Sequence, residues 1–362
     1  MKILLVIDDL GSGGAQRQLI NLGIGFLSYG HQVYFLTYHS NDFYKKHLDD
    51  YQIPIYQISS NNKIKRLFKI RNFIRSHNFD SVLSFLDGAN FICQFSSLPF
   101  KSWKLVIGER NAHPSITTSP RMIFSRWFHF VADFIVANSQ SNLDLVKKAN
   151  PFLNSRKMWV IYNIVDLDYW KPANNYSFKK NGKVNLLIAA RHQEQKNITE
   201  LINAVLLLSV NDKNNVTINW YGDEHVNDDT LVKAKKLINE LGLTQIFNFY
   251  PATKNILPII QNCDAVGLFS KYEGFPNFLC EGMACAKPVI STDISDISRI
   301  IPKEGIFLCN SHLPQTIANA LQQLINSSSD DLEKMGKINL NTASLYFNKE
   351  NIIKDYLKLL EK

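Results

Sequence analysis

The stretch "AVGLFSKYEGFPNFLCEGMACAKPVISTD" (residues 265–293) decides the fold, because two short apolar runs flank a helical segment. The first run lies within a strand expected at 264–269 and leads into a loop that contains Gly274 and Pro276, and the second run lies within a strand expected at 288–291. Strand, loop, helix and strand in this order are the repeating unit of a parallel sheet covered by helices. We therefore expect an α/β protein.

The same alternation continues toward both ends of the chain, and 362 residues suit two domains better than one. Residues 166–182 lose the periodicity and are rich in Pro, Asn, Gly and Lys, which predicts a linker. We expect doubly wound, Rossmann-like domains over 1–165 and 183–345, and a final helix over 346–362 that packs back toward the first domain. The strands are expected at 2–8, 32–38, 54–58, 80–86, 103–108, 132–138 and 157–162, and then at 183–190, 215–221, 246–249, 264–269, 288–291 and 306–308.

Composition narrows the class of protein. Hydrophobic residues make up 45% of the chain and charged residues 20%, which is typical of a soluble globular protein. No run approaches the ~20 apolar residues that cross a bilayer, and "MKILLVIDDL" is too short and too acidic for a signal peptide. The five cysteines include no C-x-x-C pair, so we expect buried reduced thiols and a cytosolic protein.

Positive charge is concentrated in the first half of the chain. Residues 1–165 hold 19 Lys and Arg against 10 Asp and Glu, whereas residues 166–362 hold 21 against 22. This asymmetry indicates an anionic partner for the first half, such as a membrane surface, a lipid phosphate or a nucleic acid. The chain has no recognisable nucleic-acid recognition motif, so nucleic acid is the disfavoured choice.

Two basic segments could lie on a membrane. "NNKIKRLFKIRNFIRSH" (61–77) has six Lys or Arg and no acid, and "PRMIFSRWFHF" (120–130) sets Arg121 and Arg126 among aromatic residues. Basic helices with aromatic faces bind membrane interfaces, and anionic lipids add about 1 kcal/mol per cation. In the alternative interpretation, the apolar stripes of both helices face the core and the cations are solvated. We expect the protein on the inner face of the cytoplasmic membrane.

The loop and helix of the opening stretch suit a phosphate. Asn277 is a good N-cap and Pro276 precedes it, so the amides of Phe278, Leu279 and Cys280 would be free at the helix start. The helix dipole favours an anion there. Carboxylates do not bind phosphate, so Glu273 and Glu281 on either side need another role.

An ionised carboxylate can accept hydrogen bonds from pairs of hydroxyls, and sugars offer such pairs. One glutamate could bind a ribose diol and the other a transferred sugar, which is the arrangement that a nucleotide-sugar requires. In the alternative, Glu273 is a loop charge and Glu281 interacts with the helix dipole. Arg191 and Lys196 follow the strand at 183–190 and could neutralise a diphosphate without a metal.

A glycine-rich turn, "DDLGSGGAQRQ" (8–18), joins the first strand to the first helix. It matches a dinucleotide fingerprint only loosely, since Gln16 replaces the third glycine and no acidic residue closes the second strand, so NAD is not expected. Gly13 and Gly14 still allow the backbone to approach a diphosphate closely. "DLD" at 166–168 mimics a metal-binding D-x-D, but it lies in the expected linker, so we expect no metal.

The combination of "GSGGAQR", "YNIVD", "ARHQEQKN" and "EGFPNFLCEGMACAKPVISTD" resembles the retaining glycosyltransferases with the GT-B fold, family 4, along nearly the whole chain. The resemblance implies a nucleotide-sugar donor, usually a UDP-sugar, as substrate, with no cofactor and no metal. It implies that the second domain binds the donor and that Arg191, Lys196 and Glu273 are catalytic. The implied donor-binding residues are Gly13, Gly14, Arg191, Lys196, Glu273, Gly274, Phe275, Asn277, Phe278, Leu279 and Glu281.

The acceptor side is implied less directly. Many relatives place a His after the fifth strand, where this chain has "IGERNAHPS" with Glu109, Arg110 and Asn111, and His113 slightly later. Transferases that act on polysaccharides and lipid-linked oligosaccharides look similar in two features. They carry an acidic and then a basic residue at this place, as Glu109 and Arg110 do here, and before a helix they have "SFLD", which ends at Asp87 in this chain. We expect transfer of a hexose or N-acetylhexosamine to a glycan, with a polyprenyl-diphosphate-linked acceptor bound by the first domain. The alternatives are a GT-B nucleotide-sugar epimerase, or a non-enzymatic basic protein that binds membranes or nucleic acid.

Overall fold

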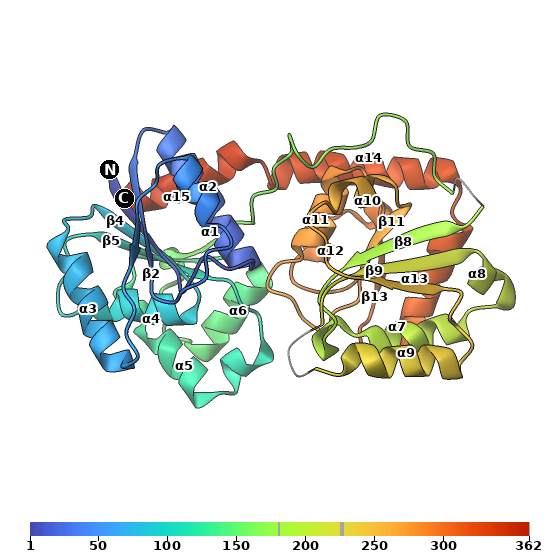
Figure 1. Cartoon of the computed structure of the whole chain (residues 1–362), viewed down its shortest axis with the longest axis horizontal. Helices are drawn as coiled ribbons and strands as arrows, with labels where there is room; N and C mark the ends of the chain where they lie inside the picture. The colour runs from blue at the N-terminus through green and yellow to red at the C-terminus, as the bar shows by residue number, and fades with distance from the viewer. Residues whose placement is uncertain (180–181, 225–227, 362) are drawn as a thin grey trace. The chain divides into compact units, whose positions relative to one another are not determined.

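The computed structural model describes residues 1–179, 182–224 and 228–361, which fall into two compact units (Figure 1). Unit 1 contains Met1–Ile164 and the segment that begins at Lys349, and unit 2 is Val165–Asn348. Lys180 and Asn181 of the expected linker, and Lys362 of the final helix, lie outside the described residues.

A seven-stranded parallel sheet forms the centre of unit 1, in the order β3-β2-β1-β4-β5-β6-β7. The chain builds outward from β1 in one direction and then returns to build outward from β4 in the other. The switch point of the sheet therefore lies between β1 and β4, where ligands bind in open α/β sheets. The strands are β1 (Lys2–Val6), β2 (Gln32–Thr37), β3 (Ile55–Gln57), β4 (Ser81–Phe85), β5 (Lys104–Glu109), β6 (Phe134–Ala137) and β7 (Met158–Val160).

Helices cover both faces of this sheet. Side chains of α1 and α15 share one core cluster, and those of α3, α4 and α6 share the other. The two helices of the first cluster touch at Gly25, where an added Cβ would come within 2.2 Å of Ile353. The helices are α1 (Gly14–Ser28), α2 (Lys45–Asp50), α3 (Lys63–Ser76), α4 (Asp87–Ser96), α5 (Pro120–Trp127), α6 (Gln140–Ala149) and α15 (Lys349–Glu361), with 3₁₀ turns η1 (Pro114–Thr117), η2 (Phe128–Val131) and η3 (Ser155–Lys157).

Unit 2 repeats this plan with a six-stranded parallel sheet in the order β10-β9-β8-β11-β12-β13, so its switch point lies between β8 and β11. Helices α7, α9 and α13 pack on one face, and α11 packs on β11 and on α14. The strands are β8 (Val184–Ala189), β9 (Val216–Tyr221), β10 (Phe247–Tyr250), β11 (Ala265–Leu268), β12 (Val289–Thr292) and β13 (Ile306–Cys309). The helices are α7 (Ile198–Leu207), α8 (Val210–Asn214), α9 (Thr230–Glu240), α10 (Leu257–Gln261), α11 (Asn277–Ala284), α12 (Ile297–Ile300), α13 (Pro314–Asn326) and α14 (Ser329–Tyr346), with 3₁₀ turns η4 (Glu194–Lys196) and η5 (Lys303–Gly305).

The structure confirms the predicted fold class, since every expected strand is present and both sheets are parallel. The segment expected to be a linker is attached to unit 2. The hydroxyl of Tyr176 donates to Asp264 at 2.8 Å, and the Lys179 ammonium donates to the carbonyl of Ile325 at 2.7 Å. All five cysteines are buried and unpaired. Among the described residues, no helix has the length and hydropathy needed to cross a bilayer.

Candidate active site

The loops at the switch point of unit 2 bring two of the predicted residues together. Lys196 ends η4 after β8, and Glu273 lies in the loop after β11, the neighbouring strand. The Lys196 ammonium forms an ion pair with Glu273 Oε1, and both side chains are mostly buried. The hydroxyl of Ser270 donates to the same oxygen at 2.6 Å. The pair therefore joins the carboxyl ends of the two central strands.

Hydrogen bonds to backbone carbonyls fix these loops against each other. The side-chain amide of Gln195 donates to the carbonyl of Tyr272 at 2.7 Å, and the amide of Lys271 donates to the carbonyl of Gln195 at 2.9 Å. The loop after β12 adds a third support, because the hydroxyl of Ser295 donates to the carbonyl of Gly274 at 2.9 Å. Hydrogen bonds from two neighbouring loops therefore hold the loop around Glu273 in place.

Arg191 lies two residues after the end of β8, and its side chain is exposed. Its backbone is placed by a close approach of two chain segments. An added Cβ at Gly222 would come within 1.9 Å of the carbonyl oxygen of Ala190, so only glycine fits there. The amide of the next residue, His192, donates to the carbonyl of Asp223 at 3.0 Å. Arg191 thus has a fixed backbone and an exposed guanidinium at the switch point.

Helix α11 differs from the prediction at its start. It begins at Asn277, so Asn277 is the first helical residue and Pro276 occupies the N-cap, which corrects the predicted Asn277 cap. The amides of Leu279 and Cys280 donate to the carbonyl of Pro276 at 3.0 and 3.3 Å. These two amides are therefore not free to bind an anion, which corrects the prediction. Of the three predicted amides, that of Phe278 remains.

The remaining donor residues predicted in unit 2 lie on or beside α11. Phe275, Phe278, Leu279 and Glu281 are buried, and Gly274 is half-buried in the loop before the helix. The ring of Phe275 packs edge-on against Phe347 at 5.7 Å between centroids. This end of the loop is therefore anchored in the core of unit 2.

The glycine-rich turn lies at the switch point of unit 1. Gly13 is the N-cap of α1 with an extended backbone, and Gly14 is its first residue and is exposed. The Gln16 side-chain amide donates to Asp9 Oδ1 at 3.2 Å, and the Gly11 amide donates to the same oxygen at 2.7 Å. The turn is thus ordered by its own side chains, with the backbone of the two glycines at the helix start.

The predicted acceptor-side residues lie in three places. Asp87 and Glu109 are joined by Arg126, which donates to Asp87 Oδ1 at 2.6 Å and to Glu109 Oε2 at 2.7 Å. Arg110 lies apart from them. It donates to Asn163 Oδ1 at 2.9 Å and to the hydroxyl of Tyr356, and its guanidinium lies 3.8 Å from the ring centroid of Phe85. Arg110 therefore contributes to the packing of α15 on the sheet.

Asn111 and His113 form a surface turn after β5. Both are exposed, and the side-chain oxygen of Asn111 accepts from the amide of His113 at 3.0 Å. The His113 ring in turn accepts from the amide of Ser115 at 3.0 Å and so caps η1. The His113 side chain therefore has a local structural role as the cap of η1.

Arg126 and His129 belong to this region, and the sequence did not single them out as site residues. The sequence placed Arg126 on a basic surface with Arg121, but its side chain is 0% exposed, which corrects that prediction. His129 Nε2 contacts Glu109 Oε1 at 2.8 Å. No spacing pattern links position 109 to 126 or 129, so only the three-dimensional structure reveals this network.

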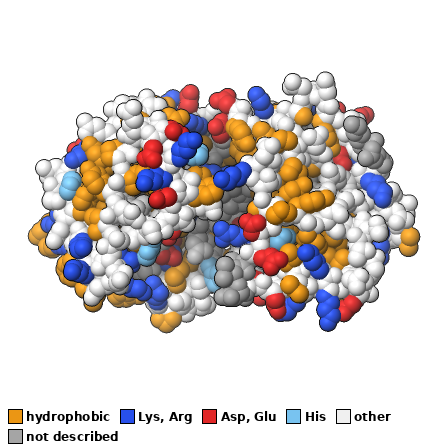
Figure 2. All heavy atoms as spheres, in the orientation of Figure 1, with side chains coloured by type: hydrophobic (Ala, Val, Ile, Leu, Met, Phe, Trp, Pro, Cys, Tyr) orange, Lys and Arg blue, Asp and Glu red, His pale blue; other side chains and the backbone are white. Residues whose placement is uncertain are grey.

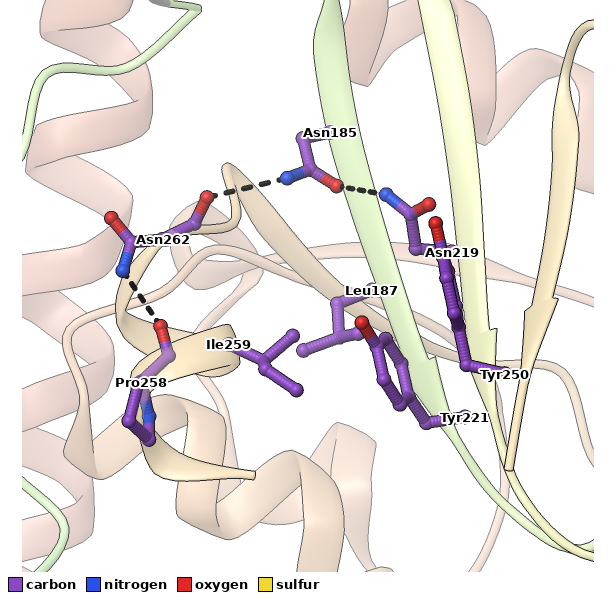
Figure 3. Close-up of a pocket in the computed structure, with 8 residues that line it drawn as sticks. All are labelled: Asn185, Leu187, Asn219, Tyr221, Tyr250, Pro258, Ile259 and Asn262. Atoms are coloured by element: carbon purple, nitrogen blue, oxygen red, sulfur yellow. Dashed lines mark hydrogen bonds between the residues drawn. The ribbon is translucent and has the colours of Figure 1, made fainter. Parts of the chain in front are cut away.

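A separate cavity of about 390 Å³ lies on the face of the unit 2 sheet near α10 (Figure 3). Side-chain amides line it in a chain, in which Asn219 donates to Asn185 at 2.7 Å and Asn185 donates to the carbonyl of Asn262 at 3.2 Å. The rings of Tyr221 and Tyr250 stack on each other at 4.6 Å. None of the predicted donor residues lines this cavity.

No group of His, Cys, Asp and Glu suited to a metal ion occurs among the described residues. The "DLD" sequence forms a turn, in which Asp166 Oδ1 accepts from the amides of Asp168 and Tyr169 at 3.1 and 3.2 Å. The carboxylate of Asp166 is thus hydrogen-bonded to the backbone of its own turn.

Two successive doubly wound parallel sheets are the architecture of the GT-B fold. The sequence matches the profile of Glycosyltransferase Family 4 over residues 12–169 and that of Glycosyl transferases group 1 over residues 173–341. The chain belongs to glycosyltransferase family 4 and is an enzyme of that family.

Related proteins match this chain over almost its whole length. A Campylobacter jejuni protein named N-acetylgalactosamine-N,N'-diacetylbacillosaminyl-diphospho-undecaprenol 4-alpha-N-acetylgalactosaminyltransferase is 27% identical over 99% of both chains. Among solved structures, Anabaena HepE in complex with UDP superposes with a TM-score of 0.87 at 20% identity and covers 100% of both chains. The lipopolysaccharide outer core galactosyltransferase WaaB has a TM-score of 0.78 at 18% identity, over 100% of this chain and 99% of its own. These structural likenesses support the fold.

Proposed function

We propose that this protein is a retaining, metal-independent transferase that moves a hexose or N-acetylhexosamine from a UDP-sugar to a polyprenyl-diphosphate-linked glycan. The observation that carries the proposal is the contact of Lys196 with Glu273 at the switch point of unit 2. A solved structure of HepE contains UDP-glucose, and the Campylobacter relative is named for transfer to a diphospho-undecaprenol-linked sugar. Both lend support to this choice of donor and acceptor.

Donor binding would use the cations of the switch point. Arg191 and Lys196 neutralise the diphosphate, and the amide of Phe278 adds a donor at the start of α11. When Lys196 turns to phosphate, Glu273 exchanges this partner for the hydroxyls of the donor sugar, while Glu281 binds the ribose. The same cations stabilise the charge that develops on the UDP leaving group.

Transfer then takes place on one face of the sugar. The acceptor hydroxyl forms a bond to C1 as the bond between C1 and the phosphate oxygen breaks, and the configuration at C1 is retained. No covalent nucleophile is needed. Catalysis in this scheme consists of positioning and of charge stabilisation by groups that are already in place.

The acceptor side would lie against a membrane. Residues 51–132 hold eleven Lys and Arg against three Asp and Glu, a net +8 that equals the charge of the whole chain. Two of these acids, Asp87 and Glu109, form ion pairs with one of these cations, Arg126. The surface of this region therefore attracts anionic lipid headgroups.

Exposed rings accompany this charge. We call them the aromatic patch, which consists of Phe68, Phe100, Phe124, Trp127, Phe130 and Phe152, exposed by 48 to 82%. Hydrophobic side chains reach the surface among Lys and Arg in the part of unit 1 where α3, α4 and α5 lie (Figure 2). Of the predicted stripe on α3, Ile74 faces the core, while Ile64 and Phe68 face solvent. Aromatic rings with basic neighbours insert at the headgroup level of a bilayer.

A panel of UDP-sugars with polyprenyl-diphosphate-linked disaccharides tests the activity, and NMR of the product reads its anomeric configuration. We expect transfer from one UDP-hexose or UDP-N-acetylhexosamine with retention. An inverted product, or no transfer from any donor, would refute the proposal. Incubation without an acceptor tests the epimerase alternative, which predicts conversion of the UDP-sugar alone.

Vesicle flotation tests the membrane surface. We expect binding to vesicles with anionic lipid, and a loss of at least about tenfold when Phe124, Trp127 and Phe130 are changed to Ser, since each ring buries apolar area in the bilayer. The matched control changes Leu206 and Leu207 of unit 2 to Ser, because these side chains are also exposed, at 42 and 53%. Equal binding to neutral and anionic vesicles would contradict the proposed surface.

A further inference from the structure

A buried charge network joins three structural elements of unit 1 to α4. Arg126 of α5 binds both Asp87 of α4 and Glu109 of β5. Glu109 is braced on its other oxygen by His129 of η2 at 2.8 Å, and the His129 Nδ1 atom lies 2.8 Å from the side-chain amide of Gln94, again in α4. The network is thus a closed ring that begins and ends on one helix.

Asp87 is the member of the network that reaches the surface. Its side chain is 35% exposed, whereas those of Arg126, Glu109 and His129 are at most 2% exposed. It is the first residue of α4 and follows β4, which pairs with β1 at the switch point of the sheet. A ligand at that point can therefore reach Asp87 and none of the groups behind it.

The network is more strained and less satisfied than stability alone requires. Leu86, directly before Asp87, has φ 77° and ψ 151°, a region that costs about 1 to 3 kcal/mol for a residue with a side chain. Arg126 Nε and Gln94 Oε1 are buried without a partner among the described residues. Well-packed apolar residues often replace buried ion pairs without loss of stability. The cost incurred here therefore favours a functional role.

We propose that Arg126 is a positioning residue that holds the Asp87 carboxylate at the switch point of unit 1, where Asp87 accepts a hydrogen bond from a hydroxyl of the acceptor sugar. This inference rests on the proposed function. Burial and the neighbouring Glu109 raise the pKa of Asp87, and Arg126 opposes both effects, so the guanidinium also helps to keep the carboxylate ionised. An ionised carboxylate is an acceptor-only group that suits a sugar hydroxyl.

The test compares steady-state kinetics of the full chain with UDP-N-acetylgalactosamine and a polyprenyl-diphosphate-linked disaccharide. We expect Asp87→Asn to raise the KM for this acceptor at least about tenfold, as for a lost hydrogen bond to a charged group, and to leave the Kd for UDP unchanged. Arg126→Lys should raise the same KM. The double variant should be no worse than the poorer single variant, because the two residues act as a unit. Arg121→Lys, on the exposed face of α5, is the matched control.

Each outcome is informative. Wild-type KM in Asp87→Asn, or additive effects in the double variant, would overturn the inference. Should Arg126→Lys fail to fold, Asp87→Glu replaces it, since it keeps the charge but moves the carboxylate by one methylene, and a wild-type KM in that variant would equally overturn the positioning role. A wild-type chain that binds UDP but transfers to no acceptor would instead refute the proposed function, and the inference with it.

Discussion

The ion pair of Lys196 with Glu273 shows how a cation and an acid can share one site. The sequence predicted separate ligands for them, a phosphate for the lysine and a sugar for the glutamate. In the structure each neutralises the other, so neither charge is left unpaired in a mostly buried position, where an isolated charge is costly. In the proposed mechanism, the two side chains exchange this contact for the diphosphate and the donor sugar.

Arg191 and Glu281 are expected to control donor use. Arg191→Ala or Glu281→Ala should lower kcat/KM for the UDP-sugar about 100-fold or more, because each variant loses a charge-assisted hydrogen bond to the donor. The control is Lys236→Ala on α9, whose side chain is 78% exposed. Wild-type turnover in either site variant would show that the donor binds elsewhere.

Glu109 should make the protein sensitive to acid. Burial alone would raise the pKa of Glu109, but Arg126 and His129 together lower it to about 2. A carboxylate with a lowered pKa stabilises the fold at pH values above its ordinary pKa of 4.5. This contribution to the free energy of unfolding is lost as the pH falls from 4.5 to about 2. The free energy of unfolding falls by roughly 3 kcal/mol at most over this range.

Urea unfolding as a function of pH measures this effect. Asp87, whose pKa is raised, acts in the opposite sense, since its contribution falls as the pH rises. Glu109 should dominate because it is fully buried. We expect Glu109→Gln to flatten the slope below pH 4.5, whereas Glu240→Gln on the surface should not. A wild-type slope in Glu109→Gln would exclude Glu109 as its source.

At the level of elements, strands were easier to predict from the sequence than helix starts. β-branched runs between turn residues identified all thirteen strands, because burial on both faces of a parallel sheet requires near-continuous apolar residues. The start of α11 was predicted one residue late, since the carbonyl of Pro276 already accepts the amides of Leu279 and Cys280. Arg126 could not be assigned, because an arginine between aromatic residues looks the same in the sequence whether it faces solvent or a carboxylate.

Helix α11 depends on a close approach to β11 at Gly282. An added Cβ there would come within 2.4 Å of Val266. Gly282→Ala should therefore lower the free energy of unfolding by about 1 to 3 kcal/mol, the usual cost of overpacking. Val266→Ala in the same chain should relieve the clash, so the double variant should be more stable than the sum of the single variants predicts. Additive losses in urea unfolding would mean that this contact is not the cause.

At the scale of the whole molecule, the groups proposed for the diphosphate, sugar and ribose lie within unit 2, apart from the glycine-rich turn of unit 1. Residues 165–348 alone should therefore fold and bind UDP, with a Kd within about tenfold of the full chain. The Arg191→Ala variant of the same fragment is the control, and calorimetry is the measurement. A fragment that binds UDP no better than this variant would show that UDP binding also needs residues outside 165–348.

Unit 1 is not continuous in sequence, and this has a consequence for its folding. The chain leaves unit 1 at Ile164 and returns at Lys349 with α15. That helix buries six large side chains, Ile352, Ile353, Tyr356, Leu357, Leu359 and Leu360. Burial of each side chain stabilises the fold by about 1.5 to 3 kcal/mol. Together these contributions approach or exceed the net free energy of unfolding of a typical domain. Residues 1–164 alone should therefore fail to fold.

A direct connection should restore the fold of unit 1. The amide of Val165 donates to the carbonyl of Phe347 at 3.2 Å, so the outgoing and returning chains run side by side and a short Gly-Ser linker can join residue 164 to 349. We expect this fusion to unfold cooperatively in urea, with near-ultraviolet circular dichroism as a second probe of tertiary packing. The same fusion with Ile353→Asp should not, since Asp would bury a charge against Gly25. If residues 1–164 unfolded cooperatively without α15, the helix would be an accessory to unit 1, and the sheet with its other helices would suffice.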